Sequence, residues 1–213
     1  IQWEPVTSDS RFDAVASGKV DLECGSTTSN LERQKRVSFS PTIFVSGTKV
    51  LVKKGTPIAS FRDLAGRKVA VTAGTTNEKT LRDLSEKFKL GIQLQVARDH
   101  AESFGLVKSG QADAFATDDV LLYGLIAQEN AKADYRVVGD FLSYDPYGIM
   151  YRKGDPQLAK VINDSFQVLA EDGEIERQYK RWFLRKLPTG ASLDLPMSAQ
   201  LETIIKTMSV KAE

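Results

Sequence analysis

Residues 68–88, KVAVTAGTTNEKTLRDLSEKF, decide the fold class of this chain. The first five residues form a short run rich in β-branched side chains, which is typical of a strand. A turn with a glycine follows, and apolar residues then recur at helical spacing, at Leu81, Leu84 and Phe88. Because a strand followed directly by a helix is half of a βαβ unit, this stretch predicts an α/β protein.

The same alternation continues on both sides of this stretch. Short β-branched runs predict further strands at residues 20–24, 42–46, 49–52, 92–96, 114–117, 135–138 and 148–151. Apolar residues at helical spacing predict helices at 10–16, 101–108, 118–128, 155–183 with an interruption at Gly173, and 198–208. Strands and helices in turn favour a mainly parallel sheet.

Composition excludes several classes of function. With 213 residues, the chain is long enough for one or two domains. Lys and Arg total 29 against 28 for Asp and Glu, so no large field of one sign is present, and we expect no nucleic-acid partner. One cysteine and one histidine are too few for a zinc site, and no motif indicates a metal or another cofactor. Cys24, at the end of an apolar strand, is interpreted as an inert core thiol.

Residues 24–33, CGSTTSNLER, form the first candidate site. Ser29 and Glu32 match a capping box, which predicts that a helix begins there. The preceding turn, from Gly25 to Thr28, then offers hydroxyls and backbone amides that favour an anion. Arg33 would lie on the first turn of the helix, where its guanidinium could pair with a carboxylate or simply be solvated.

Two further strand-to-helix junctions carry related chemistry. The turn at 72–78, TAGTTNE, again places hydroxyls before a helix, either for an anion or as an ordinary helix cap. At Asp118 and Asp119 one carboxylate would cap a helix and the other could meet an ammonium group. Together, an arginine with hydroxyls and an aspartate would recognise an α-amino acid.

His100 is the only histidine, and it lies after a predicted strand at the start of a helix. It could act as a general base, contact a ligand or cap the helix at the surface. The chain has no Gly-x-Ser-x-Gly elbow, no Walker A loop and no Gly-x-Gly-x-x-Gly fingerprint. Motifs of the commonest hydrolases and nucleotide-binding enzymes are therefore missing, and we expect no enzymatic activity.

Motifs along nearly the whole chain resemble those of the periplasmic amino-acid-binding proteins of ABC importers, solute-binding protein family 3. They are Gly25-Ser-Thr-Thr, Glu32-Arg33, Phe39-Ser-Pro41, Lys53-Lys-Gly55, Ser60-Phe-Arg-Asp-Leu-Ala-Gly66, Val71-Thr-Ala-Gly-Thr-Thr76, Asp113-Ala-Phe-Ala-Thr-Asp118, Tyr151-Arg-Lys-Gly-Asp-Pro156, Gly173-Glu-Ile-Glu and Lys180-Arg-Trp182. The sequence is most similar to the glutamate/aspartate-binding branch, on Cys24-Gly-Ser-Thr-Thr, Glu32-Arg-Gln-Lys and Asp99-His100 with Glu102-Ser-Phe.

The resemblance implies a role for eight side chains. At the α-amino acid end of the ligand, Arg33 would clamp the α-carboxylate with Thr28, Thr76 and their backbone amides, Asp118 would bind the ammonium, and Ser26 would lie near the same end.

For the ligand's side-chain carboxylate, the resemblance implies Ser8, Arg11 and His100. Nothing in the residues alone singles out Ser8 or Arg11, which are typical of a helix cap and a first helical turn. Glutamine should be rejected, because it would leave an arginine in the site without its anion.

The resemblance further implies a two-lobe periplasmic-binding-protein-like α/β fold of type II. Lobe one would hold residues 1–46 and 145–213 and lack its N-terminal strand and helix, since the chain begins within an apparent strand; lobe two would hold residues 47–144. An acidic amino acid would bind in the cleft, and after hinge closure the protein would dock on the permease subunits of the importer in the periplasm.

Two alternatives remain beside this interpretation. One is a ligand-sensing domain of a larger membrane receptor or enzyme, and the other is a periplasmic dehydratase of the same fold. The preference between glutamate and aspartate and the oligomeric state stay open.

Overall fold

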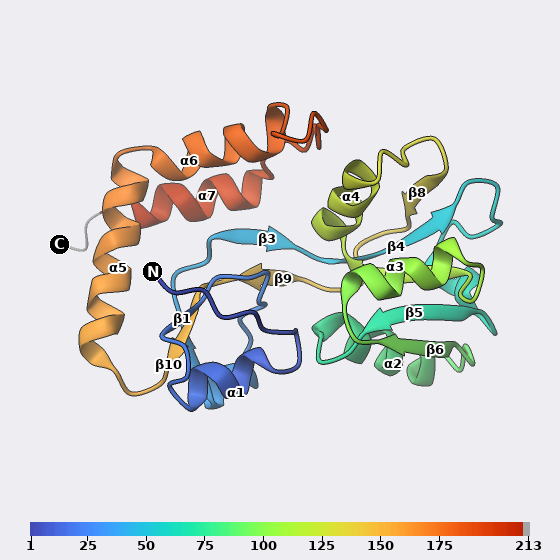
Figure 1. Cartoon of the computed structure of the whole chain (residues 1–213), viewed down its shortest axis with the longest axis horizontal. Coiled ribbons are helices and arrows are strands. Elements are labelled where there is room, and N and C mark those ends of the chain that lie inside the picture. The colour runs from blue at the N-terminus through green and yellow to red at the C-terminus, as the bar shows by residue number, and fades with distance from the viewer. Residues whose placement is uncertain (211–213) are drawn as a thin grey trace. The chain divides into compact units, whose positions relative to one another are not determined.

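The computed structural model describes residues 1–210. The chain forms two compact units (Figure 1). Unit 1 consists of residues 1–4, 10–45 and 146–213, and unit 2 consists of residues 5–9 and 46–145. Near its start, the chain enters unit 2 at Pro5 and returns to unit 1 at Ser10. It later makes two further crossings between the units, at Val45 and Ser46 and at Asp145 and Pro146.

Unit 2 is built on a five-stranded sheet with the order β6-β5-β7-β4-β8. Its strands are β4 (Thr48–Lys53), β5 (Lys68–Thr72), β6 (Gln93–Ala97), β7 (Ala114–Asp118) and β8 (Tyr135–Val138). Its helices are η2 (Phe61–Leu64), α2 (Thr76–Lys87), α3 (His100–Lys108) and α4 (Asp119–Gln128). The helix predicted from residues 68–88 is thus confirmed as α2, directly after β5 (Figure 1).

The prediction of a mainly parallel sheet is wrong. Only β5 pairs in parallel, with β6 and with β7, while β4 is antiparallel to both β7 and β8. Parallel pairing needs a crossover connection. Helix α2 connects β5 to β6, and α3 connects β6 to β7. No helical crossover leads into β4, because the chain enters it from the crossing segment at Ser46.

Successive side chains of each strand point to opposite faces of the sheet, so unit 2 has a hydrophobic core on each face. Val69 and Val71 of β5 pack on the face that holds Leu81 of α2. Ala70, between them, lies in the opposite core, together with Phe104 of α3 and residues of α4. The two crossover helices, α2 and α3, are thereby packed against opposite faces of the sheet, which positions the residues at their N-termini.

Unit 1 contains a small antiparallel sheet and a group of helices (Figure 1). The sheet has the order β1-β10-β2, from β1 (Leu22–Glu23), β10 (Met150–Arg152) and β2 (Val37–Phe39). Helix α1 (Arg11–Ala16) packs on it through Phe12 and Val15, against Val37 and Met150. The segments at the two crossings contain β3 (Phe44–Ser46) and β9 (Asp145–Tyr147), which pair with each other.

The helical tail of unit 1 follows its prediction. It comprises α5 (Pro156–Glu171), α6 (Glu174–Tyr179), the π-helical segment η3 (Lys180–Leu184) and α7 (Ala199–Met208). The interruption at Gly173 is confirmed, because this residue has φ +66° and begins a new helix as its N-cap. Figure 1 shows α5 crossing beside α6 and α7, whose contact residues include Ala170, Tyr179, Leu201 and Ile205.

Two local predictions in unit 1 are wrong. The helix expected from Ser29 is only the 3-10 turn η1 (Arg33–Lys35), whose N-cap residue is Glu32 rather than Ser29. Just before this turn, the Asn30 side chain accepts from the Arg33 backbone N–H at 2.9 Å. Strand β1 ends before Cys24, so that cysteine is exposed and is not a core thiol. Partial burial of its sulfur and the neighbouring Glu23 carboxylate raise the Cys24 pKa, which disfavours the nucleophilic thiolate.

Within residues 1–210, no helix is long and apolar enough to cross a membrane. The same residues contain no group of three or more His, Cys, Asp or Glu side chains placed to hold a metal ion.

Candidate functional site

The hydroxyl-rich turn of unit 1 is organised around a carboxylate of the protein itself. Glu23 is 8% exposed and accepts from the Gly25 backbone N–H at 2.9 Å through Oε1. Its Oε2 accepts from the fully buried Thr27 hydroxyl at 2.5 Å. Two of the donors that the sequence suggested for a ligand anion are therefore used by Glu23.

Arg11 extends this chain of contacts. It is 6% exposed, and its Nη1 donates to Thr27 Oγ1 at 2.6 Å and to the Ser26 carbonyl at 3.4 Å. Because the Thr27 proton points to Glu23, the Thr27 oxygen is available to accept from Arg11. A buried cation and a buried anion are thus joined through one hydroxyl, which reduces the cost of burying each charge.

Arg33 supports the other end of the same turn. Its Nη1 donates to the Thr28 carbonyl at 2.9 Å, and its guanidinium lies 4.9 Å from the centre of the Phe12 ring. The Arg11 guanidinium lies 5.5 Å from the same ring. Phe12 therefore brings the two predicted arginines of unit 1 to one aromatic side chain, in the range of cation–π contacts.

The remaining predicted residues near this turn differ in their surroundings. Thr28 is 3% exposed and pairs with Tyr147 in an isolated antiparallel bridge, whereas Ser26 is half-buried. Ser8 lies in the turn before α1 and belongs to unit 2. The expectation that Ser8 caps the following helix is wrong, because the N-cap residue of α1 is Ser10.

In unit 2, the turn between β5 and α2 is an ordinary helix cap with one additional contact. The Thr75 side chain accepts from the Glu78 backbone N–H at 3.2 Å, and Thr75 Oγ1 donates to the Thr72 carbonyl at 2.7 Å. Thr76, the first residue of α2, directs its hydroxyl to Asp145 Oδ1 at 2.9 Å. The Thr76 side chain is therefore already bonded to a carboxylate of the protein.

Asn77 connects Asp118 to the interior of unit 2. Its Nδ2 donates to Asp118 Oδ1 at 2.8 Å and to Thr48 Oγ1 at 2.7 Å, while its Oδ1 accepts from the Thr117 hydroxyl at 3.3 Å. All four side chains are at most 3% exposed. Asp118 is the N-cap residue of α4, but its side chain makes no capping hydrogen bond. Its carboxylate is oriented by Asn77 instead.

A second buried carboxylate, Asp145, terminates the same network. Thr48 Oγ1 lies 2.7 Å from Ser143 Oγ, the Thr48 backbone N–H donates to that oxygen at 2.9 Å, and Ser143 in turn donates to Asp145 Oδ2. Asp145 is 2% exposed. Since Ser143 uses its only hydroxyl proton on Asp145, it can only accept from Thr48, so both hydroxyl protons along this path point toward Asp145. The network thus holds two carboxylates with neutral donors.

His100 begins α3 and points back onto the sheet. Its Nδ1 lies 2.8 Å from the hydroxyl of Thr72 on β5, and its ring centre is 6.2 Å from that of Phe115 on β7. The helix is capped by Asp99, whose side chain accepts from the Glu102 backbone N–H at 2.8 Å. That hydrogen bond is the main cause that lowers the Asp99 pKa. His100 is therefore a half-buried side chain with a fixed ring and is not itself the cap.

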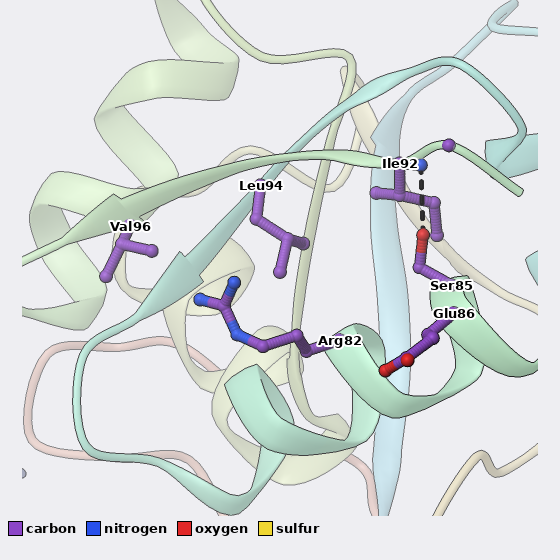
Figure 2. A pocket seen from close by; sticks show the side chains of 7 residues that line it. Arg82, Ser85, Glu86, Ile92, Leu94 and Val96 are labelled. Atoms are coloured by element: carbon purple, nitrogen blue, oxygen red, sulfur yellow. Dashed lines mark hydrogen bonds between the residues drawn. The ribbon is translucent and has the colours of Figure 1, made fainter.

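A hollow of about 590 Å³ lies elsewhere in unit 2, between α2 and the edge strand β6 (Figure 2). Its walls carry Arg82 and Glu86 from α2 and the apolar side chains of Ile92, Leu94 and Val96. Figure 2 shows the Ile92 backbone N–H bonded to Ser85 Oγ at 3.0 Å. None of the predicted site residues lines this hollow, and Arg82 is paired with Glu78, so it is not the predicted site.

Sequence reasoning did not assign a role to the polar residues behind the site. They are the buried Glu23, Thr27, Thr48, Thr72, Asn77, Ser103 and Asp145, and the half-buried Ser143. Some indication of Thr27 and Asn77 was present in the sequence, because they lie in the turns at 25–28 and 72–78, each beside a predicted ligand contact. For Thr48 and Asp145 there was none, since their partners lie far away in the sequence and only the fold brings them together.

Comparison with known proteins identifies the family. Residues 1–185 match the model of the bacterial extracellular solute-binding proteins, family 3. The chain is 42% identical to the L-glutamate/L-aspartate-binding protein of Pseudomonas aeruginosa and 41% identical to the glutamate/aspartate import solute-binding protein of Salmonella typhimurium. Each alignment covers 100% of this chain and 70% of the relative.

A solved structure of an ancestral arginine-binding protein bound to arginine is similar to this fold, with a TM-score of 0.79 and 33% identity. The match covers 85% of this chain and 80% of the other. The predicted periplasmic-binding-protein-like α/β fold is confirmed by this similarity. On the strength of the sequence match over residues 1–185, the chain belongs to the bacterial extracellular solute-binding proteins, family 3.

Proposed function

We propose that this chain is the solute-binding component of an ABC importer for acidic amino acids. It binds L-glutamate or L-aspartate in the periplasm and delivers it to the permease subunits of the importer. The observation that carries the proposal is the 42% identity, over all 213 residues, to an L-glutamate/L-aspartate-binding protein. The task is binding and release, so the proposal includes no chemical step.

The proposed lobes are residues 1–46 with 145–213, and residues 47–144. Contacts within the chain divide it close to these limits, at Val45/Ser46 and Asp145/Pro146, which supports the division. Each unit contributes part of the proposed set of ligand groups. Unit 1 contributes Arg11, Ser26, Thr28 and Arg33, while Ser8, Thr76, His100 and Asp118 belong to unit 2.

For the α-amino acid group, we assign the carboxylate to Arg33 and the ammonium to Asp118. Arg33 is oriented by the Thr28 carbonyl and Phe12, and its planar guanidinium is of the kind that pairs bidentately with a carboxylate. Asp118 is supported by Asn77, and its carboxylate can accept from the ammonium at its other lone pairs. Because the Thr76 hydroxyl donates to Asp145, Thr76 contributes through its backbone N–H at the start of α2.

For the side-chain carboxylate of the ligand, we assign Arg11 and His100, with Ser8 beside them. Arg11 is joined through Thr27 to Glu23, so its buried charge is partly balanced within the protein. Its planar guanidinium is suited to pair with the side-chain carboxylate of the ligand as a further anionic partner. Glutamine has a neutral amide at that position and would leave the cation under-compensated, so it should bind much more weakly.

A thermal unfolding screen tests the proposal. Ligand-free protein is heated with each of the twenty amino acids, and glutarate, which lacks the ammonium group, is the control. Glutamate or aspartate at one hundred times its Kd should stabilise the folded chain by about 2.7 kcal/mol, which raises Tm by about 5–10 °C for a chain of this size. Stabilisation by glutamine or arginine with none by either acid would overturn the proposal.

A further inference from the structure

A chain of hydrogen bonds through Thr72, Ser103 and the Asp99 carbonyl determines which ring nitrogen of His100 carries a hydrogen. His100 Nδ1 lies 2.8 Å from Thr72 Oγ1, which lies 2.8 Å from Ser103 Oγ. Ser103 Oγ donates at 3.0 Å to the Asp99 backbone carbonyl, which can only accept. Thr72 is 1% exposed and Ser103 is fully buried.

The directions of these hydrogen bonds can be followed from the carbonyl. The single hydroxyl proton of Ser103 is used on Asp99, so Ser103 can only accept from Thr72. The proton of Thr72 is then used on Ser103, and Thr72 can only accept from His100. His100 Nδ1 must therefore carry a hydrogen. Whenever the imidazole is neutral, Nε2 then has no hydrogen and can only accept.

A ligand carboxylate has only acceptor oxygens, so it cannot bond to a bare Nε2. We propose that recognition of the acidic side chain requires His100 in its doubly protonated, cationic form, and that Thr72 and Ser103 are positioning residues that enforce this requirement. The inference rests on the proposed function and adds that binding takes up a proton. A neutral amide can donate to the bare Nε2, so the preference for acid over amide should weaken as the pH rises.

The surroundings of His100 leave few other groups to titrate with it. The elements packed against α3 carry Lys68 at the far end of β5 and Asp118 at the near end of β7, whereas β6 has no charged residue. Near the start of α3 lie Arg98, Asp99 and Glu102. The chain has one histidine, and the pKa of its one cysteine is raised above the usual value. Proton uptake between pH 6 and pH 8 therefore reports mainly on His100.

Calorimetric titration with L-glutamate in buffers of low and high ionisation enthalpy measures this uptake directly. We expect more protons bound per glutamate at pH 8 than at pH 6, approaching one, because binding requires the cationic ring. By linkage, the affinity should fall by up to about ten-fold for each pH unit over which one proton is taken up. The ionisation of glutamate's carboxyl groups does not change over this range.

Four variants, one of them a control, separate a positioning role of Thr72 and Ser103 from a merely structural one. Thr72→Val removes the acceptor from Nδ1, and Ser103→Ala frees the Thr72 proton to point at Nδ1. Both substitutions allow a neutral ring that carries its hydrogen on Nε2. Both should therefore weaken the pH dependence of the glutamate affinity and reduce the proton uptake on binding. Ser109→Ala, on the same helix but bonded to Leu106, should keep both properties of the wild type. In His100→Gln, the neutral side-chain amide can donate to a carboxylate without taking up a proton, so this variant should abolish the proton uptake.

The outcomes distinguish this inference from the proposed function. Tight glutamate binding with the same Kd at pH 6 and pH 8 and no proton uptake overturns the role of Thr72 and Ser103 but leaves the proposed function standing. Unchanged proton uptake in Thr72→Val and Ser103→Ala also overturns it. No binding of either acid at any pH would reject the proposed function itself.

Discussion

Two of the predicted ligand groups, Arg11 and Asp118, are each held by a buried polar neighbour that is not itself a predicted contact. Thr27 accepts from Arg11, and Asn77 donates to Asp118. Hydrogen bonds of this kind fix a charged group at one orientation before a ligand arrives, so less ordering is needed on binding. At the scale of residues, specificity for the ligand therefore depends on the polar neighbours that orient Arg11 and Asp118 as well as on the charges of these two side chains.

Replacing Asn77 by leucine tests this dependence. Asn77→Leu keeps the volume but removes the donor to Asp118, so the carboxylate that binds the ammonium loses its orientation. The loss of a hydrogen bond to a charged group is worth about 1.5–3 kcal/mol, which predicts a roughly ten- to hundred-fold higher Kd for glutamate. Asn163→Leu, on the exposed surface of α5, is the matched control and should bind as the wild type does. An unchanged Kd in Asn77→Leu would show that Asp118 does not bind the ammonium.

Arg33→Lys tests the carboxylate clamp. A lysine cannot donate to the Thr28 carbonyl and also pair bidentately with a ligand, so we expect about ten-fold weaker glutamate binding. The same substitution at Arg36, an exposed residue paired with Asp13, should have no effect on Kd. Equal Kd values for Arg33→Lys and the wild type, measured by titration calorimetry, would exclude Arg33 from the clamp.

At the scale of elements, the βα pattern of unit 2 could be predicted because its signals are local. Alternating valines and a capped amphipathic helix fix β5 and α2 within about twenty residues. The short elements β2 and β9 were missed, since β9 contains a proline and both owe their pairing to distant strands. The helix expected at Ser29 is wrong, because the capping-box pattern is local whereas the chain here forms only a 3-10 turn that begins after Glu32.

The cap of α3 offers a test of this element and of its pH dependence. Asp99→Ala removes the acceptor for the Glu102 N–H and should lower the free energy of unfolding by about 1 kcal/mol at pH 7. The folded state holds the Asp99 pKa below its ordinary value of 3.8, so this stabilisation is complete above that value. It is lost as the pH falls through the lower, folded pKa.

Urea unfolding at pH 7 and at progressively lower pH measures the difference between Asp99→Ala and the wild type. We expect this difference to shrink only in acid. Asp83→Ala, which removes an exposed ion pair with Lys79, should change stability by less than about 0.5 kcal/mol. A pH-independent difference for Asp99→Ala would contradict the capping role of the carboxylate.

At the scale of the whole molecule, the balanced composition means that recognition is local. The net charge is only +1, so a dicarboxylic amino acid is not drawn to the protein by a large field. In the proposed site, Arg33 faces the α-carboxylate, Asp118 faces the ammonium, and Arg11 together with the cationic His100 faces the side-chain carboxylate. The family and the fold could be predicted from motifs spread along the chain, while the hydrogen-bond networks behind those motifs required the structure.

Titration calorimetry of the ligand-free chain with L-glutamate, L-aspartate and L-glutamine at pH 6.5 tests recognition of an acidic amino acid most directly. We predict one binding site per chain, saturable heat from at least one of the two acids, and no saturable heat from glutamine at the same concentrations. A chain that circular dichroism shows to be folded, yet that gives no heat with either acid or binds glutamine as tightly, would contradict the account.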